Sequence, residues 1–335
     1  MTRSLIRCAS ATGIAIATVL AASPRASADD VAPASSAAAP SAAAPSAPAP
    51  SAAAPSAAAR SVLARFSTPY AYDAEHKTRA ANVELAAEAI NGKVIAAGGG
   101  FSFNDAVGER TSAFGYEKSV VIRDGMIAEG MGGGACQVAS TLHAAALLAG
   151  LDVVMRAPHS RPSAYIRMGL DATVAMGPGS PAIDLKLKSS SVDPVVIRAR
   201  AARGTLDVWI DTAGTQRPDV SVTSEIVERT AFLRVVERDK RATDDLVRVK
   251  SFGIPGFRIK RTREIRFADG TLKHDVRVDV YPPISEIVQV AASFDESRLE
   301  APLPASALVA LPGATRPALV QLRPSTRVVL DNAAR

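Results

Sequence analysis

The sequence is poor in cysteine and in aromatic residues, and after residue 28 it has no long apolar run. Its two cysteines are Cys8 and Cys136. Because Cys8 lies in an N-terminal segment that we expect to be removed, the mature chain would keep one thiol and form no internal disulfide. Aromatic residues make up 4 % of the chain and are not interleaved with basic residues, as they are in single-strand binders. A membrane span needs about 20 apolar residues. We therefore expect no nucleic acid partner and no transmembrane segment in the mature chain.

The same scarcity limits the classes of cofactor. The chain has four histidines and would keep one cysteine, which is too few for a closed four-ligand zinc site. The glycine-rich segment 132–134 lacks the lysine of a phosphate-binding P-loop. The net charge of +6 halves when the N-terminal segment takes Arg3, Arg7 and Arg25 with it, which is too weak an excess to indicate nucleic acid. We expect neither a metal nor a cofactor.

The first 28 residues have the pattern of a secretory signal. Two arginines precede the apolar run Ala9–Ala22, and residues 26–28 form a small-x-small cleavage site. Residues 29–59 are almost wholly Ala, Pro and Ser, a composition typical of a semi-rigid spacer. We therefore expect a secreted or periplasmic protein, associated with the cell envelope, whose mature chain begins with a spacer.

The rest of the chain divides by pattern into two folded regions and a tail. Residues 60–215 predict a mixed α+β domain, because helical periodicity at 78–97 and 135–149 alternates with short strand-like runs. The strand-like runs include those that carry Tyr165 and Thr173. The second helix carries Cys136 and is expected to pack on these short strands. Period-two patterns without helical periodicity predict a smaller all-β module at 221–295, followed by a poorly ordered tail at 301–335.

The strongest chemical signal is a cysteine at a predicted helix start, directly after Gly132-Gly133-Gly134. Free backbone N–H groups and the helix dipole stabilise a thiolate at this position, and the same N–H groups can hold a developing oxyanion. Glycines allow a close backbone approach that any Cβ would block. The alternative is that Cys136 is a buried structural residue at a tight helix start.

A histidine and a carboxylate follow Cys136 in the order of a catalytic triad. We predict that Cys136 is the nucleophile, His159 the general base and acid, and Asp171 the group that orients the imidazole. His143, on the same predicted helix, is too far from the thiol to serve as its base. The residues expected to bind substrate or hold the oxyanion are Gly132, Gly133, Gly134, Gln137 and Tyr165.

Residues from about 85 to 200 resemble the VanW-like family of bacterial exported proteins. The residues that carry the resemblance are Gly108-Glu109-Arg110-Thr111, Gly115-Tyr116, Gly132–Gln137, Ser140-Thr141-Leu142, Ala149-Gly150-Leu151, Arg156, His159-Ser160, Tyr165 and Gly169–Val174. Ala139 and the pair His143-Ala144 depart from the family's common Ser and Tyr-Asn. The resemblance implies a role in the bacterial envelope and a link with vancomycin-resistance gene clusters. The order Cys, His, Asp is also similar to that of transglutaminase-like cysteine folds.

The strand-rich region is similar to the G-five module of wall-associated proteins. The residues concerned are Gly253-Ile254-Pro255-Gly256, Lys260–Phe267, Asp269-Gly270-Thr271 and Tyr281-Pro282-Pro283. This similarity implies a wall- or glycan-binding module; the alternative is a sheet whose Gly and Pro residues serve only its turns.

Two functions from different classes follow from these patterns. One is thiol-dependent acyl hydrolysis or transfer on cell-wall peptides, which requires a reactive Cys136. The other is a non-catalytic accessory protein that binds peptidoglycan or its precursors, in which Cys136 is inert. The reactivity of the thiol distinguishes them, because a buried structural cysteine resists alkylation.

Overall fold

We describe the fold from a computed structural model in which residues 61–123, 125–176, 182–243, 246–299 and 328–331 can be described. All of these belong to one unit of the chain, Pro55–Arg335. The expected signal segment and spacer lie outside the described residues, and so does the expected tail except for β16 (Val328–Asp331). Within the described ranges, no helix is both long enough and apolar enough to cross a membrane.

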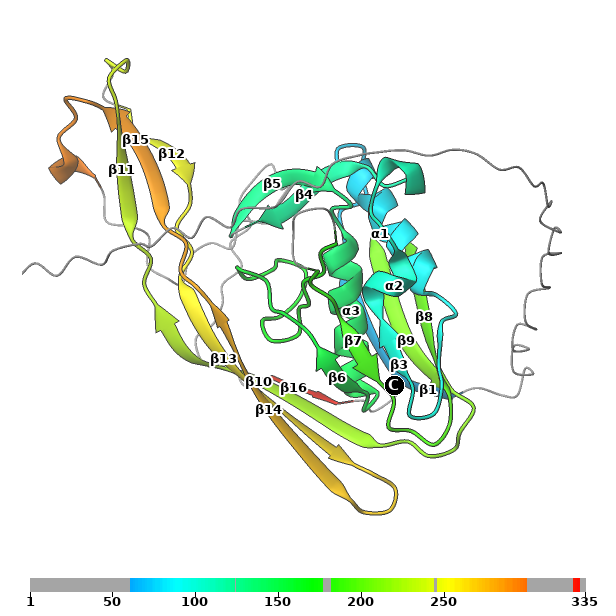
Figure 1. Ribbon diagram of the computed structural model, residues 1–335. Coiled ribbons are helices and arrows are strands. Elements are labelled where there is room, and N and C mark those ends of the chain that lie inside the picture. The colour runs from blue at the N-terminus through cyan, green and yellow to red at the C-terminus, as the bar shows by residue number, and fades with distance from the viewer. Residues whose placement is uncertain (1–60, 124, 177–181, 244–245, 300–327, 332–335) are drawn as a thin grey trace, which may run out of the picture. The chain divides into compact units, whose positions relative to one another are not determined.

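An antiparallel four-stranded sheet forms one layer of the part of the chain between residues 61 and 212, with the order β1-β9-β8-β2 (Figure 1). Its strands are β1 (Ser61–Pro69), β9 (Thr205–Thr212), β8 (Val195–Ala202) and β2 (Val94–Ile95). The tight turn between β8 and β9 uses Arg203 and Gly204, both with positive φ, as a two-residue hairpin of twisted strands requires. Alternate side chains of β9 (Leu206, Val208 and Ile210) are fully buried, and so this sheet has an apolar inner face.

Two longer helices pack on this sheet: α1 (Lys77–Ile90) against β8, and α3 (Ala135–Leu148) against β1 and β9. Every residue of α3 except Cys136 is buried. A helix that is apolar on all sides belongs inside a protein, and the alanine-rich sequence of α3 lets neighbouring elements approach it closely. Cys136 is therefore the one position at which α3 is open to its surroundings.

Smaller elements surround the beginning and the end of α3. They are β3 (Gly100–Ser102), α2 (Phe103–Val107), the short 3₁₀ helix η1 (Ser112–Phe114), β4 (Lys118–Arg123), β5 (Met126–Met131), β6 (Asp152–Met155) and β7 (Lys186–Lys188). Strands β3, β7 and β6 form a three-stranded sheet, and β4 pairs with β5 as a hairpin. The end of β5 leads directly into the glycine turn before α3.

The remaining strands form two further sheets. The first has the order β14-β13-β10-β16, and the second has the order β11-β15-β12. The bounds are β10 (Asp219–Thr230), β11 (Arg234–Asp239), β12 (Arg248–Ser251), β13 (Gly256–Arg266), β14 (Leu272–Tyr281) and β15 (Glu286–Ala291), followed by the 3₁₀ helix η2 (Glu296–Arg298). Strand β11 runs parallel to β15, whereas the other pairs are antiparallel.

Strands β10 and β13 share the main hydrophobic core with α3. Val220, Val222 and Ile265 belong to the same buried cluster as Leu142 and Leu148 of α3. These strands therefore cover a side of α3 that the first sheet does not. The domain boundaries expected between 215 and 221 stay a prediction.

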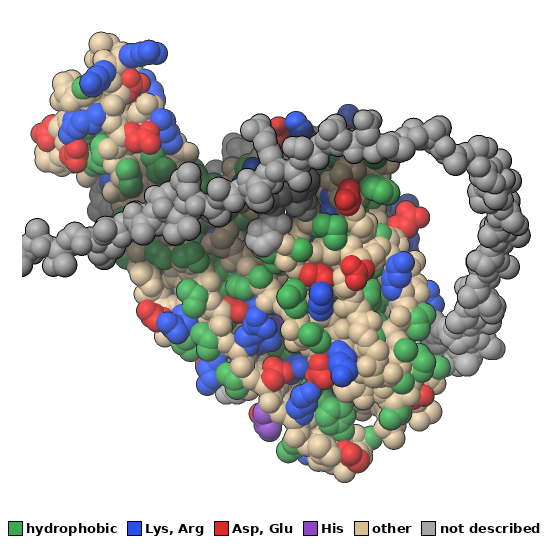
Figure 2. Space-filling view, viewed as in Figure 1, with side chains coloured by type: hydrophobic (Ala, Val, Ile, Leu, Met, Phe, Trp, Pro, Cys, Tyr) green, Lys and Arg blue, Asp and Glu red, His purple; other side chains and the backbone are tan. Residues whose placement is uncertain are grey.

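Charged side chains of both signs are interspersed over the face of the molecule that Figure 2 shows. Neighbouring strands carry some of them as cross-strand pairs, such as Arg258 of β13 with Glu228 of β10 at 3.1 Å and Lys260 with Glu225 at 3.8 Å. Exposed pairs of this kind contribute about 0–1 kcal/mol each. These pairs therefore add little to the stability of the fold; their main effect is to make the surface of the sheet hydrophilic.

The expected fold class, a mixed α+β domain followed by a small β module, is wrong. Strands make up 45 % of the structure and helices 17 %, so the described part of the chain is mostly β. Two of the expected short strands are absent: residues 164–167 form a turn, and 172–175 make only isolated bridges, from Thr173 to Ala157 and from Ala175 to Ile183. The first helix also ends earlier than expected, at Ile90, because Val94–Ile95 pairs with β8 as a strand.

Candidate active site

Cys136 is the second residue of α3 and follows a turn that only glycine fits. Gly132 and Gly134 have φ of +69° and +120°, which other residues rarely adopt. A Cβ on Gly132 would lie 2.6 Å from Cβ of Arg110, and one on Gly134 would lie 2.8 Å from Cγ2 of Val83. The turn is therefore packed against protein on all three residues, and it fixes the place at which α3 begins.

The middle glycine gives a stability prediction. A Cβ on Gly133 would lie 2.3 Å from the Ser119 hydroxyl and 2.5 Å from the backbone oxygen of Val120, which cannot move aside. We expect Gly133→Ala to lower the free energy of unfolding by about 1–3 kcal/mol, the usual cost of overpacking. Urea denaturation measures it. The matched control is Gly100→Ala, whose nearest contact would be 3.6 Å, and an equal loss in both variants would contradict the prediction.

The sulfur of Cys136 lies against the segment that follows Asp171. The backbone N–H of Val174 donates to Sγ at 3.4 Å, and the carbonyl of the same residue lies 3.4 Å from Sγ. Burial raises the pKa of the thiol, but the hydrogen bond and positive charge of His159, the Val174 N–H and the charge of Arg110 outweigh it. The net result is a pKa below the ordinary value of 9.0. This environment favours the thiolate.

His159 is the partner that accounts for most of this effect. Its Nδ1 lies 2.8 Å from Oδ2 of Asp171, and the hydroxyl of Tyr165 lies 3.5 Å from its Nε2. Burial lowers the pKa of His159, but Tyr165, the hydrogen bond with Asp171 and the contact with Cys136 together raise it well above 6.5. A raised imidazole pKa beside a lowered thiol pKa favours transfer of the thiol proton to the imidazole.

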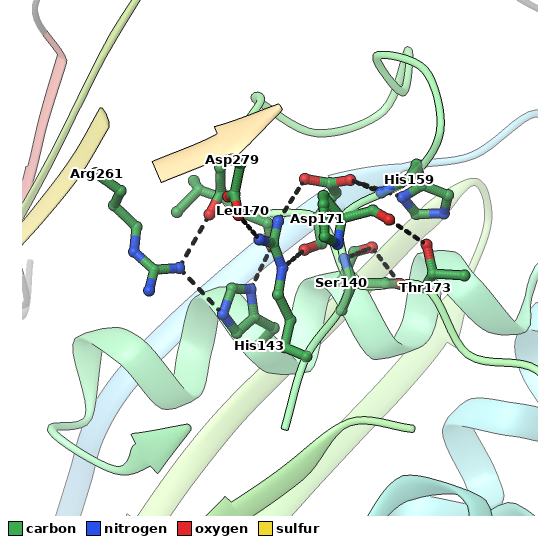
Figure 3. Close-up of polar contacts among 12 residues, drawn as sticks. Ser140, His143, His159, Leu170, Asp171, Thr173, Arg261 and Asp279 are labelled. Atoms are coloured by element: carbon green, nitrogen blue, oxygen red, sulfur yellow. Dashed lines mark hydrogen bonds and ion pairs between the residues drawn. The ribbon is translucent and has the colours of Figure 1, made fainter. Parts of the chain in front are cut away.

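Asp171 is held by four hydrogen bonds and is 1 % exposed. Oδ2 accepts from the backbone N–H and from Nδ1 of His159, at 2.7 and 2.8 Å. Oδ1 accepts from Arg156 at 2.8 Å and from the hydroxyl of Tyr281. Burial raises the pKa of this carboxyl, but His159, Arg156 and Tyr281 lower it by more, so it lies well below its ordinary value and Asp171 stays ionised. Figure 3 shows its carboxylate turned toward His159.

The loop that carries His159 and Asp171 is fastened to α3 by side chains instead of by a sheet. The hydroxyl of Ser140 on α3 accepts from the Ala172 N–H at 2.8 Å and lies 3.2 Å from the Ala172 carbonyl. Thr173 donates to the carbonyl of Pro158 at 3.0 Å (Figure 3). These bonds bring two loop residues, His159 and Asp171, beside the start of a helix.

Strand β14 contributes an outer layer to the site. Arg156, with a fully buried side chain, pairs with Asp171 on one side and with Asp279 of β14 on the other, at 2.8 and 2.5 Å. Tyr281, also on β14, donates to Asp171 and accepts from the Gly169 N–H at 2.8 Å. The carboxylate of the predicted triad is therefore fixed by residues more than a hundred positions away in the chain.

His143 belongs to this outer layer and not to the thiol. It is fully buried, its Nδ1 lies 2.7 Å from the carbonyl of Leu170, and its Nε2 lies 3.3 Å from Nη1 of Arg261 (Figure 3). Burial, with the charges of Arg156 and Arg261, holds the pKa of His143 well below 6.5, so it is neutral. Nδ1–H then donates to Leu170 and Nε2 accepts from Arg261.

His159 and Asp171 are hydrogen-bonded, and the sulfur of Cys136 lies against Val174, three residues after Asp171, but one of the expected binding residues has other partners. Gln137 is buried, and both amide hydrogens are used, by Thr68 at 3.0 Å and by the Pro69 carbonyl at 2.8 Å. This side chain has no donor left for an oxyanion, which corrects that expectation. The residues Gly132, Gly133 and Gly134 are buried, while Tyr165 lies beside His159; their roles in substrate binding stay predictions.

Sequence reasoning missed two arginines near the thiol. Arg79 of α1 donates to Oε1 of Gln137 at 2.9 Å, and its guanidinium carbon lies 5.9 Å from the centre of the Tyr165 ring. Arg110 packs its side chain on Gly132, and its charge also lowers the pKa of the thiol. Arg110 belongs to the segment Gly108–Thr111 that carries the family resemblance, whereas Arg79 has no sequence pattern that separates it from an ordinary surface residue.

Comparisons with known proteins bear on the same region. Residues 78–210 match the family described as "VanW like protein". Over 139 residues the chain is 38 % identical to "Uncharacterized protein YoaR" of Bacillus subtilis (strain 168), a match that covers 42 % of this chain and 45 % of that protein. The chain thus spans less than half of the length of this relative.

A solved structure titled "IgA1 Protease G5 domain structure" is 16 % identical and covers 23 % of this chain and 95 % of its own, with a TM-score of 0.17. That score is too low to support an argument about the strand-rich region. The residues matched by the family include all three residues of the predicted triad. Residues 78–210, with Cys136, His159 and Asp171, are therefore similar to the VanW-like family.

Proposed function

We propose that this protein is a cell-envelope enzyme that hydrolyses or transfers an acyl group at an amide bond of a cell-wall peptide. The observation that carries the proposal is the connected set Cys136, His159 and Asp171, in which the thiol pKa is lowered and the imidazole pKa raised. A buried structural cysteine needs neither shift. The combination is the one that thiol-dependent acyl transfer requires.

The proposed reaction proceeds in two steps. The thiolate of Cys136 attacks the amide carbon and forms a C–S bond, and the C–N bond then breaks as the imidazolium of His159 gives its proton to the leaving amine. Water, or the amine of an acceptor peptide, next attacks the thioester; His159 takes the proton of this nucleophile, and the C–S bond breaks. Asp171 keeps Nδ1 protonated, so that Nε2 is the atom that exchanges the proton.

A backbone donor is available for the oxyanion of both steps. The N–H groups of Ala135, Gln137 and Val138 donate back to Gly132 and Gly134. The N–H of Cys136 itself makes no hydrogen bond within the described part of the chain. It lies at the positive end of a 14-residue helix. Loss of such a donor typically lowers the rate about a hundredfold or more, so this N–H would contribute substantially to catalysis by stabilising the oxyanion.

The envelope location and the substrate class rest on different support. The N-terminal pattern of a secretory signal supports export, and the resemblance to the VanW-like family supports the bacterial envelope. Peptide amides are the amide bonds that an exported bacterial enzyme meets most often in the wall. Determining the first residue of the protein purified from its native cells tests export, and a retained Met1 would overturn that part.

The catalytic part is tested by product analysis. The full-length protein and its Cys136→Ala variant are incubated with soluble wall fragments, and mass spectrometry follows new amine and carboxylate ends. We expect products from the wild type only, together with a covalent thioester adduct on Cys136 when the reaction is quenched in acid. An absence of products and adduct, together with unchanged binding of wall fragments by Cys136→Ala, would overturn catalysis in favour of a binding role.

A further inference from the structure

Two arginines lie against neighbours of Cys136 and His159. Arg79 donates to Gln137, the residue after Cys136, and its guanidinium lies over the ring of Tyr165, whose hydroxyl is beside His159. The side chain of Arg110 packs on Gly132, in the turn that precedes Cys136. The charge interactions of both arginines extend to Cys136.

Neither arginine has a carboxylate partner within ion-pair distance among the residues that the structure describes. The hydrogen bonds of Arg79 and Arg110 go to uncharged oxygens instead, namely Gln137 Oε1, Asn104 Oδ1 and the carbonyl of Gly108. The charge of Asp184 acts on Arg110 from beyond ion-pair distance, and Asp184 is itself engaged by Ser102 and the Asn104 N–H. Partly buried arginines usually have a carboxylate partner, so the lack of one for Arg79 and for Arg110 among the described residues is unusual.

The arginines also keep unused donors. Arg79, which is half-buried, uses only Nη2, and Arg110, which is 9 % exposed, uses only its two Nη atoms. Within the described part of the chain, none of their remaining nitrogens is a fully enclosed atom without a partner. A guanidinium with free, accessible N–H groups is a ready partner for a planar anion.

The charges around the sulfur leave a positive excess. Arg156 pairs with Asp171 at 2.8 Å and with Asp279 at 2.5 Å, and a thiolate at Cys136 would balance an imidazolium at His159. Arg79 and Arg110 are then left without a counter-charge. One positive neighbour, His159, is enough to stabilise a thiolate. The nucleophile therefore does not need the charges of Arg79 and Arg110.

We propose that Arg79 and Arg110 form a carboxylate subsite beside Cys136, so that the substrate is a peptide bearing a free carboxylate next to the amide that is cleaved. This inference rests on the proposed function and specifies its substrate class. A carboxylate matches the planar fork of a guanidinium, whereas a neutral carboxamide leaves both charges unpaired. The subsite would thus select substrates by charge.

Paired alkylating reagents test the subsite without any knowledge of the natural substrate. Iodoacetate and iodoacetamide both react when the thiolate displaces iodide, forming a C–S bond and breaking the C–I bond, and only iodoacetate carries a carboxylate. We expect the rate ratio of iodoacetate to iodoacetamide at Cys136 to exceed that of glutathione by about tenfold, the lower end of the gain from a focused charge. High salt should reduce this preference.

Charge variants connect the preference to the two arginines. Arg79→Gln and Arg110→Gln should each lower the ratio severalfold, whereas Arg258→Gln, an exposed arginine paired with Glu228, should leave it unchanged. Arg79→Lys keeps the charge and should keep most of the preference, which guards against a loss caused only by misfolding. With wall peptides, a free carboxylate beside the amide should speed turnover about tenfold over its carboxamide.

The outcomes separate the two proposals. Rapid alkylation by both reagents, with the ratio of free glutathione, would overturn the carboxylate subsite and leave the reactive thiol in place. Slow alkylation by both reagents would overturn the proposed function, and the subsite would fall with it. A preference that survives both glutamine substitutions would show that other groups attract the anion, and would also overturn the assignment.

Discussion

Replacing Asp171 with asparagine is expected to slow any thiol-dependent turnover by about 10³–10⁴-fold, as the loss of the orienting acid does in other triads. The hydrogen bond with Asp171 is one of the interactions that raise the pKa of His159, and the charge of His159 in turn lowers the pKa of Cys136. Removing the carboxylate therefore makes the imidazolium less stable and the thiol harder to ionise. The pH midpoint for alkylation of Cys136 by iodoacetamide should move upward.

The geometry explains why asparagine is a poor replacement. All four groups that face the carboxylate are donors: the N–H and Nδ1 of His159, Arg156 and the Tyr281 hydroxyl. An amide NH₂ must point at one pair of them, and a buried donor that faces another donor costs about 1–3 kcal/mol. If the NH₂ faces His159, it also donates to Nδ1 and moves the ring proton to Nε2, the wrong tautomer for a base.

The control is Asp152→Asn, which neutralises a partly exposed acid paired with Lys273. It should leave the alkylation profile unchanged. An identical profile in wild type and Asp171→Asn would mean that the carboxylate does not act on the thiol, and the triad assignment would then be wrong.

Part of the candidate site can be predicted from the sequence because its chemistry is local. A cysteine after three glycines indicates a helix start, and Cys136 is the second residue of α3. The order Cys136, His159, Asp171 predicts a triad; His159 and Asp171 are hydrogen-bonded at 2.8 Å, and the catalytic roles of the three residues stay a prediction. Each element of this prediction depended on one residue type at one spacing.

The contacts that β14 makes with the site cannot be predicted from its sequence pattern, because this strand exposes its valines and buries the residues that alternate with them. A strand with alternating valines normally buries them. Here Val276, Val278 and Val280 are 59, 48 and 54 % exposed, whereas Asp279 and Tyr281 are 3 and 1 % exposed. Buried ions are tolerated only when they are paired, and the partner of Asp279 is Arg156, over a hundred residues earlier. No local sequence pattern predicts the pairing of Arg156 with Asp279.

The absence of the two expected strands has a related cause. The two long helices were identified by their periodicity, but the loop from Arg156 to Ala175 was assigned strands where the structure has turns and isolated bridges. Its conformation is set by side-chain bonds, such as that of Ser140 with Ala172, and by the salt bridge of Arg156 with Asp171. Propensity cannot predict a segment whose hydrogen bonds go to side chains of distant elements.

The ionised state of Asp171 also makes stability depend on pH. Because the folded pKa is lowered from 3.8, the carboxylate contributes stability at any pH above that unfolded value. This contribution is lost as the pH falls through 3.8 toward the lower folded pKa. The groups that hold the pKa down, His159 and Arg156, therefore also set the acid limit of the fold.

Replacing Arg156 with methionine is expected to give a large loss of stability, about 3–5 kcal/mol, because it leaves two buried carboxylates without their cation. The side chain is fully buried between Asp171 and Asp279, which are 1 and 3 % exposed. Urea denaturation of the full chain measures the loss. Lys273→Met, at the exposed pair with Asp152, is the control and should cost at most about 1 kcal/mol. Adding Asp279→Asn to Arg156→Met should recover part of the loss by removing one unpaired charge. A cost for Arg156→Met no larger than that of the control would show that the buried ion network does not hold β14 against the site.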